Sequence, residues 1–419
     1  MAPDLQAPRG TQDILPDEQP RWDHVRDTAE RLCREFRYAE IETPVFEDVT
    51  LFKRTVGDAT DIVQKEMYVF EDRGGQELAL RPEGTAPVCR AYIEHGMHNQ
   101  PQPVRLYYVT PIFRYDRPQA GRYREHHQFG VEAIGDVSAS VDAETIELLW
   151  RLYEELGLTN LTLNLNSIGD SNCRPRYLDA LRDYYRDKLD KVCADCRGRF
   201  EKNPLRLLDC KDKKCQDIIA GAPDFTDYLC DACAEHFSEL RSYMNGLGIP
   251  YVINQRLVRG LDYYTRTVFE VQPLEERGQS TVGGGGRYDG LIEKLGGKPT
   301  PGVGFATGIE RIILNLKRQG VPLPDTTPLD IFVTVLLPEA RVPAFRLASD
   351  LRRAGHSAVV GAGDRSLKAQ MRHADALHAT YVAILGEREL AAGEVTLKRL
   401  SDGEQQTVAM SDVADRLRS

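Results

Sequence analysis

Residues 105–134 decide the fold, and they read Arg105-Leu-Tyr-Tyr-Val-Thr-Pro-Ile-Phe-Arg114-Tyr-Asp-Arg-Pro-Gln-Ala-Gly-Arg122-Tyr-Arg-Glu-His-His-Gln128-Phe-Gly-Val-Glu132-Ala-Ile134. The pattern alternates over residues 105–115 and again over residues 126–134, as expected for strands. The intervening loop, residues 116–122, is rich in turn formers and arginine. Two strands joined in this way predict an antiparallel hairpin with a long loop.

One face of this hairpin suits a small charged ligand. Side chains alternate between the faces of a strand, so Gln128, Gly130 and Glu132 share one face, and Gly130 leaves space between the two polar groups. Arg114 closes the partner strand and Arg122 lies in the loop, where guanidinium groups can grip phosphates. The residues alone leave open the alternative of a solvated edge hairpin.

Composition indicates an ordinary globular protein. The chain has 419 residues, 41% hydrophobic and 28% charged, with a formal net charge of −10. This balance excludes a globally basic nucleic-acid coat but allows a local basic patch. We expect no membrane-spanning segment and no secretory signal. Nine cysteines argue against a secreted disulfide framework, so we expect a cytoplasmic protein.

The chain divides into several regions. Helical periodicity predicts a helix over residues 19–36 and another over 309–316. Residues 171–250 are polar and cysteine-rich, and they resemble an inserted helical subdomain. The proline-rich stretch 318–328 predicts a linker. Beyond it, strands are predicted at 330–337, 358–360 and 381–385 and helices at 344–354 and 366–377, which together indicate a small α/β domain with an at least partly parallel sheet.

Three further segments carry glycine or arginine in unusual density. They are Leu257–Glu270, which contains Arg259, Tyr263 and Tyr264; Gly283–Gly290; and Gly302–Arg311. Glycines in a strand allow close approach of a ligand to the backbone, but a turn or bulge is the common alternative. Neither glycine segment matches a dinucleotide fingerprint or a P-loop.

With these residues in view, the chain resembles the histidyl-tRNA synthetase family of class II aminoacyl-tRNA synthetases, essentially end to end. Thr43-Pro44 is similar to motif 1, the hairpin residues to motif 2, and Gly302–Arg311 to motif 3. Leu257–Glu270 and Gly284–Gly290 resemble two signatures that are nearly private to this family. The opening Pro8–Asp13 and the segment Leu80–Thr85 also match.

The resemblance implies an α+β fold. It comprises a class II catalytic domain over residues 1–325, built on an antiparallel sheet with flanking helices and carrying the helical insertion 171–250. An α/β anticodon-binding domain would occupy residues 329–419. The implied activity is ATP-dependent ligation of L-histidine to histidine tRNA through a histidyl-adenylate, with Mg²⁺ accompanying ATP, in a cytoplasmic homodimer.

The family's residue roles carry over by position. The implied catalytic residues are Arg259 and Arg114; those for histidine binding are Glu83, Thr85, Gln128, Glu132, Arg259, Tyr263 and Tyr264; those for ATP are Arg114, Arg122, His126 and Arg311; and those facing the tRNA acceptor end are Arg117 and Gln119. One departure concerns His126, which stands where the family often has a phenylalanine against adenine. An imidazole can stack there, but it covers less area.

Two rival functions remain. A non-catalytic relative, the regulatory subunit of ATP phosphoribosyltransferase, shares the core but typically lacks the anticodon domain and loses signature residues. The second rival is a class II synthetase for proline, threonine or glycine. The segment from Arg259 to Tyr264 argues against this rival. Both signatures and a C-terminal domain are present here, which favours the enzyme.

The cysteines require separate treatment. Cys193-x-x-Cys196 and Cys230-x-x-Cys233 have the spacing of zinc ligands, so we predict a structural zinc site made of these four residues. Two observations argue against this site. The family does not generally need a metal here, and with Cys210 and Cys215 between the pairs there are six thiols, more than a single four-ligand site uses.

A basic patch is predicted in the C-terminal domain. Its members are Arg352, Arg353, Arg365, Lys368 and Arg372, which outnumber the nearby acids. Such a patch suits a phosphate backbone, and the resemblance makes this domain an anticodon binder. For any one of these residues a solvated helix face is the alternative.

Overall fold

The computed structural model describes residues 5–57, 60, 62–119, 121–274, 281–322, 328–363 and 365–418. The chain divides into two compact units, Met1–Leu323 and Pro324–Ser419. The predicted linker 318–328 lies partly in helix α10 and partly, at 323–327, outside the described residues. None of the helices in the described ranges has the length and apolar character needed to cross a bilayer.

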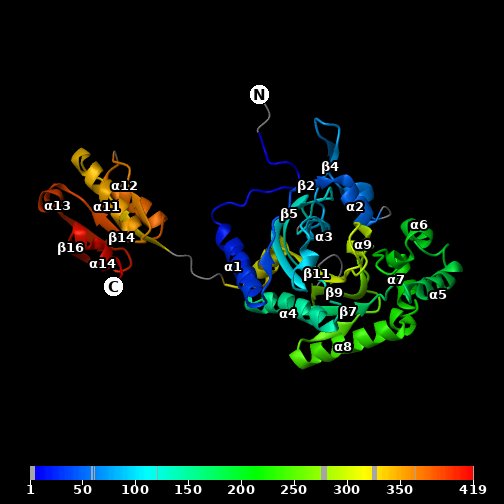
Figure 1. Ribbon diagram of the computed structural model, residues 1–419. Helices are drawn as coiled ribbons and strands as arrows, with labels where there is room; N and C mark the ends of the chain where they lie inside the picture. The colour runs from blue at the N-terminus through cyan, green and yellow to red at the C-terminus, as the bar shows by residue number, and fades with distance from the viewer. Residues whose placement is uncertain are drawn as a thin grey trace. The chain divides into compact units, whose positions relative to one another are not determined.

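A large sheet forms the centre of the first unit (Figure 1). In spatial order its strands are β1 (Ala39–Glu40), β5 (Val104–Phe113), β6 (Glu125–Ile134), β11 (Gly302–Gly308), β10 (Gly283–Arg287), β9 (Thr265–Pro273), β7 (Leu161–Ser167) and β8 (Tyr251–Ile253). All pairs are antiparallel except β1 with β5 and β7 with β8. The predicted hairpin is therefore confirmed as β5–β6, and the predicted antiparallel core with it.

One face of this sheet is covered by helices α1 (Gln19–Glu35), α4 (Ala139–Glu155) and α10 (Ile309–Gln319). Phe129, Val131 and Ala133 of β6 are buried in that core. Because strand side chains alternate, Gln128, Gly130 and Glu132 lie on the opposite face, as predicted. The helix predicted to end at Leu316 continues for three further residues, to Gln319.

A smaller sheet and several helices lie beside the large sheet in the same unit. The small sheet has the order β2 (Phe46–Asp48), β4 (Glu77–Leu80), β3 (Val69–Glu71), and the helices beside it are α2 (Val49–Val56), α3 (Thr85–Glu94) and α9 (Leu291–Lys294). The side chain of Asp48 caps α2 by accepting the backbone N–H of Thr50 at 2.8 Å. This arrangement places the N-terminus of α3 at the polar face of β6.

The predicted insertion is helical. Its helices are α5 (Arg174–Arg186), α6 (Ala194–Lys202), α7 (Lys213–Ala220) and α8 (Asp231–Leu247), and they lie together at one end of the sheet in Figure 1. Helix α8 packs against α4. There, His236 Nε2 lies 2.5 Å from Asp142 Oδ2, and Asp142 also pairs with Arg287 at 2.8 Å.

This buried ionic cluster explains one signature of the sequence. Arg287, from the Gly284–Gly290 segment, is fully buried and donates to the carbonyls of Asp136 and Ser138 as well as to Asp142. These contacts connect β10 to the start of α4.

The second unit has its own five-stranded sheet. Its order is β13 (Ala358–Val360), β12 (Leu329–Val333), β14 (Ala379–Ile384), β15 (Glu394–Arg399), β16 (Gln405–Ala409), and its helices are α11 (Arg341–Arg353), α12 (Leu367–Ala376), α13 (Glu387–Ala392) and α14 (Val413–Leu417). The first three strands are parallel and the last two are added antiparallel. The partly parallel sheet is confirmed, but the strand predicted over 330–337 ends at Val333.

Candidate active site

The floor of the site is the polar face of the β5–β6 hairpin. Tyr108 is paired with Gly130, and a Cβ added to Gly130 would lie 2.3 Å from the Tyr108 ring. The same ring would meet a Cβ on Gly84 at 2.4 Å. The space expected beside Gly130 is therefore filled by Tyr108, and glycine is required at both positions because no side chain fits under the ring.

A cavity of about 280 Å³ opens above this floor. Most of the predicted ligand-binding residues line it: Glu83, Thr85, Arg114, Arg122, His126, Gln128, Arg259, Tyr263, Tyr264 and Arg311. These side chains come from the β5–β6 loop, β6, the start of α3 with the residues before it, the segment before β9, and α10. Glu132, Arg117 and Gln119 are not among its lining residues.

Four arginines, Arg114, Arg122, Arg259 and Arg311, line the cavity. Arg114 Nε donates to the Pro82 carbonyl at 2.7 Å, and Arg311 Nε donates to the Gly121 carbonyl at 2.9 Å. Arg259 is paired with Glu270. Burial lowers the pKa of Arg311, and the nearby charges of Arg122 and Arg114 lower it further. Because arginine stays protonated in proteins, these side chains are suited to binding an anion.

Two buried polar atoms, on residues that line the cavity, lack partners within the described parts of the chain. They are Nε of Arg259 and Oε1 of Gln128, and both are shielded from solvent. Buried polar groups in folded proteins are nearly always hydrogen-bonded. A donor and an acceptor left unpaired in the same cavity therefore indicate a ligand that supplies both an acceptor and a donor.

His126 provides an uncharged ring at the arginine end. Burial lowers its pKa to about 3, assisted by the charges of Arg114 and Arg311. The imidazole is consequently neutral at physiological pH. A neutral ring that lines the cavity is suited to stacking on a flat heterocycle rather than to binding phosphate.

Two buried carboxyl groups also belong to this region. Glu83 accepts the backbone N–H groups of Thr85 and Ala86 at 2.7 and 2.8 Å, at the N-terminus of α3. Glu132 is fully buried beneath the cavity, where it accepts the Thr85 hydroxyl at 2.7 Å and the Tyr288 hydroxyl at 2.6 Å. Burial raises the pKa of Glu132 to about 8. Direct contact of Glu132 with a ligand stays a prediction.

Several residues of the site were not predicted from the sequence. Tyr108 lines the cavity and also donates to Glu132 at 3.3 Å, whereas Tyr288 supports Glu132 from behind. Glu270 lines the cavity as the partner of Arg259. Strand alternation was the available signal for Tyr108, because it lies two residues from Thr110, which faces Gln128 across the hairpin.

The residues predicted to meet tRNA lie elsewhere. Arg117 and Gln119 are exposed in the loop of the hairpin. In the second unit, Arg365, Lys368 and Arg372 are exposed on or beside α12. Arg352 on α11, also a member of the predicted patch, makes hydrogen bonds within its own unit. Its Nε and Nη2 donate to the Ala358 carbonyl at 2.9 and 2.6 Å.

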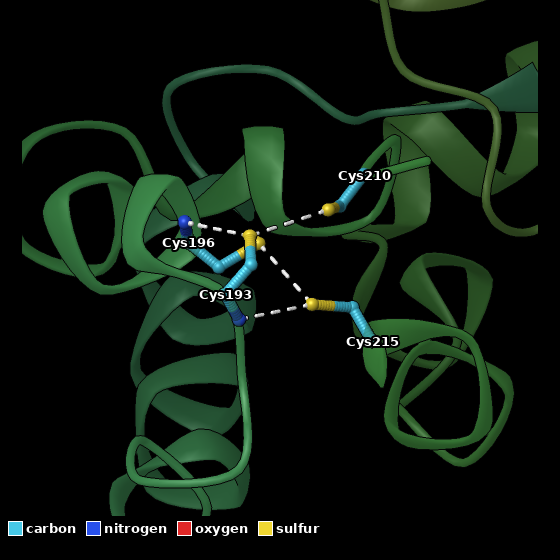
Figure 2. Close-up of side chains that lie close together, drawn as sticks. All are labelled: Cys193, Cys196, Cys210 and Cys215. Carbon is cyan, nitrogen blue, oxygen red and sulfur yellow. Dashed lines mark hydrogen bonds between the residues drawn. The ribbon is translucent and has the colours of Figure 1, made fainter. Parts of the chain in front are cut away.

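The predicted cysteine site is wrong in its membership. Cys193 and Cys196 converge with Cys210 and Cys215, as Figure 2 shows, and not with the other C-x-x-C pair. Cys230 and Cys233 converge instead with Asp170 and Cys173. The two pairs flank separate stretches of the insertion, so sequence spacing alone could not reveal which residues fold back onto them.

Comparisons with known proteins agree with this geometry. A family model described as histidyl-tRNA synthetase matches residues 10–312, and one described as an anticodon binding domain matches residues 330–419. The chain is 56% identical over 409 residues to a histidine–tRNA ligase of Dehalococcoides mccartyi, covering 97% of this chain and 98% of the relative. It is 51% identical over 411 residues to the histidine–tRNA ligase of Pelotomaculum thermopropionicum, covering 98% and 97%.

A solved structure extends the likeness to three dimensions. The apo histidyl-tRNA synthetase of S. aureus superposes with a TM-score of 0.85 at 37% identity, covering 99% of this chain and 100% of that one. Its match runs through both units of the chain. On sequence and on structure, the chain belongs to the histidyl-tRNA synthetase family.

Proposed function

We propose that this protein ligates L-histidine to histidine tRNA in two steps, using ATP to form a histidyl-adenylate and then transferring the histidyl group to the tRNA. The observation that carries the proposal is the lining of one cavity by four arginines, together with Arg259 Nε and Gln128 Oε1, which have no partner among the described residues. The full-length likeness to proteins named histidine–tRNA ligase supports the same activity.

The arginines suit the first step. The histidine carboxylate attacks the α-phosphorus of ATP and pyrophosphate leaves, so negative charge must be positioned and stabilised while little covalent help is needed. We assign Arg114 and Arg259 to the α-phosphate and Arg311, with Arg122, to the departing phosphates. His126 would lie against the adenine. The free Nε of Arg259 then has an acceptor in the phosphate or the histidine carboxylate.

ATP enters as its magnesium complex, and Mg²⁺ prefers oxygen ligands. Glu270 and Glu310 are carboxylates that line the cavity and could hold it. Both are already engaged: Glu270 with Arg259, and Glu310 with His127 at 3.0 Å. When bound, the ion would offset charge on the phosphates, and the arginines carry the remainder.

The other end of the cavity suits histidine. Glu83 and Gln128 offer acceptors for its amino group, and Tyr264 and Glu132 would read the imidazole. A site built to accept a ring N–H can reject amino acids that lack it by roughly 10⁴ or more. Tyr263 donates to Glu83 at 3.4 Å and would orient that carboxylate.

The tRNA would use both units. We assign residues 1–325, with the insertion 171–250, to catalysis and residues 329–419 to the anticodon. Arg117 and Gln119 would face the acceptor end. The exposed basic residues Arg365, Lys368 and Arg372 would contact the phosphate backbone in the second unit.

We also propose that the enzyme is a cytoplasmic homodimer. Phe46 and Phe70 of the small sheet are 51% and 41% exposed, and their rings pack edge to face with centroids 6.2 Å apart. Val45 and Val69 beside them are also exposed. An apolar patch of this kind favours burial by a second copy. Phe46→Glu should shift the protein to monomers on a sizing column.

Histidine-dependent pyrophosphate–ATP exchange, measured across a panel of amino acids, tests the proposal. We expect exchange with histidine alone, followed by charging of histidine tRNA. The regulatory-subunit alternative predicts histidine binding without exchange. Exchange supported by proline, threonine or glycine would point to the other rival.

A further inference from the structure

Four cysteine sulfurs of the insertion converge on one point. Cys193 and Cys196 begin helix α6, Cys210 lies in the following loop, and Cys215 is in the first turn of α7. Their sulfur atoms all lie within 4.8 Å of one another, and Figure 2 shows them facing a common centre. Residues separated by 22 positions in the sequence therefore present one compact set of soft ligands.

The spacing of these sulfurs is that of a metal site and not of disulfides. Cys193 and Cys210 have their sulfurs 3.7 Å apart, and Cys215 and Cys196 have theirs 3.8 Å apart. Four sulfurs placed tetrahedrally about 2.3 Å from a zinc ion are about 3.8 Å from one another. A disulfide would need about 2.05 Å.

The backbone also favours thiolates at this point. The N–H of Cys196 donates to Cys193 Sγ at 3.4 Å, and the N–H of Cys193 donates to Cys215 Sγ at 3.3 Å. Donors aimed at sulfur stabilise the deprotonated form that binds metal, in the way that second-shell groups do in metalloproteins. Cys193 also caps the N-terminus of α6.

A second cluster has the same character with one oxygen ligand. Asp170 Oδ1 lies 3.7 Å from Cys173 Sγ and 3.9 Å from Cys230 Sγ, and Cys233 completes the group. In a tetrahedral site with Zn–S near 2.3 Å and Zn–O near 2.1 Å, the expected S–O distance is about 3.6 Å. The N–H of Asp170 donates to Cys173 Sγ at 3.3 Å.

We infer that the insertion binds two structural zinc ions, one held by Cys193, Cys196, Cys210 and Cys215 and the other by Asp170, Cys173, Cys230 and Cys233. The second site joins the start of the insertion to the beginning of α8, and the first closes the loop between α6 and α7 within it. Together the two ions would add metal–ligand bonds to an insertion whose helices also share a buried apolar core.

The first site also lies next to a contact with the segment before β9. The segment between its two halves contains Asn203, which donates to Asp262 at 2.7 Å, and Arg206, which pairs with Asp209 at 2.8 Å. Asp262 lies between Arg259 and Tyr263, so zinc in the four-cysteine site would steady the segment that carries both.

Metal analysis of the full-length chain, purified under reducing conditions without chelator, tests the inference independently of catalysis. We expect about two zinc ions per chain, falling to about one in Cys196→Ser and in Cys233→Ser. The control Cys33→Ala changes a buried cysteine of the α1 core and should keep both. The two remaining sites differ in their number of thiolate ligands. Cys233→Ser leaves the four-cysteine site, whereas Cys196→Ser leaves the site with three cysteines and Asp170. Cobalt substitution should therefore give stronger thiolate charge-transfer absorption in Cys233→Ser than in Cys196→Ser.

A measurement on the unmodified chain avoids variants that fail to fold. Displacing zinc with a mercurial should release about two ions to a zinc-sensitive dye and open residues 174–229 to trypsin. Metal-free protein with a protease-resistant insertion overturns the inference. A result of one zinc per chain overturns one of the two proposed sites. The variant that then loses the remaining ion shows which site binds zinc. Stoichiometric iron in place of zinc overturns the identity of the metal.

Discussion

Replacing Arg259 by alanine separates binding from chemistry at the proposed active site. The guanidinium lies in the cavity with its Nε unpaired within the described parts of the chain, and Glu270 holds the other end. If that Nε reaches the α-phosphate only as charge develops, its loss lowers the rate more than it weakens histidine binding. Removing one such donor typically costs about 10²–10³ in rate, or about 3–4 kcal/mol.

The structure also bounds the stability cost of this change. Glu270 would lose its ion pair, but it would still accept hydrogen bonds from Gln272 at 2.7 Å and from Thr281 at 2.9 Å. The Glu270 carboxylate therefore keeps hydrogen-bond donors after the arginine is removed. We expect the loss of the ion pair to lower the free energy of unfolding by about 1–3 kcal/mol. Urea denaturation measures this term separately from activity.

Pyrophosphate exchange provides the assay. For Arg259→Ala we expect kcat to fall by about 10²–10³ while KM for histidine changes by less than about tenfold. The double variant Arg259→Gln with Glu270→Gln keeps a neutral hydrogen-bonding pair and should be equally impaired, since it restores packing but not charge. A folded Arg259→Ala protein with a near-normal exchange rate would show that another group stabilises the α-phosphate.

Other predictions address the folded core, a titrating group and the second unit. Asp142→Asn leaves the buried Arg287 with Asp289, 3.1 Å away, as its remaining charge partner, and should lower the free energy of unfolding by about 3 kcal/mol, measured in urea; a loss below about 1 kcal/mol would refute the role of the cluster. Since the pKa of Glu132 is raised from 4.5 to about 8, its contribution to stability is complete below pH 4.5 and is lost as the pH rises through 8. Stability measured over that window should fall with pH, by at most about 1.4 kcal/mol per pH unit from this group, and Glu132→Gln should flatten the slope; an unchanged slope would contradict the shift. A chain ending at Arg318 should keep part of its histidine-dependent exchange but lose most tRNA charging, increasingly so with salt. If that truncated chain is folded and charges tRNA normally, the assignment of 329–419 to the anticodon is wrong.

Local sequence patterns predicted the elements that depend on local periodicity. The β5–β6 hairpin follows from strict alternation, and α11, β13 and α12 of the second unit follow from their helical and strand spacing. The added hairpin β15–β16 was not predicted, because its strands, Glu394–Arg399 and Gln405–Ala409, carry enough polar residues to resemble a surface loop. They gain a buried face only because β15 pairs with β14 and β16 pairs with β15.

Spatial convergence accounts for what could not be predicted at the site. The cysteine pairs have equal spacing, yet each finds its partners in a different part of the insertion. Tyr108 was read as a strand residue, and its position under the cavity depends on the glycines at 84 and 130, which come from different segments. Such relations arise from tertiary packing, which periodicity does not encode.

The arginines of the signatures divide into two kinds that only the structure separates. Arg81 and Arg287 are 2% and 0% exposed, and their guanidinium groups are used by the protein itself. Arg81 donates to the carbonyls of Pro111 and Thr43, both at 2.8 Å, so it joins the motif 1 segment to the hairpin.

Arg114, Arg259 and Arg311 differ because each keeps part of its guanidinium in the cavity while the rest is anchored. Anchoring fixes the donors before the ligand arrives, so little reorganisation is needed as charge develops on phosphate. An arginine whose N–H groups are all hydrogen-bonded within the protein has no donor available for a ligand. Substitution of Arg81 or Arg287 should therefore appear first as lost stability, and substitution of the cavity arginines first as lost catalysis.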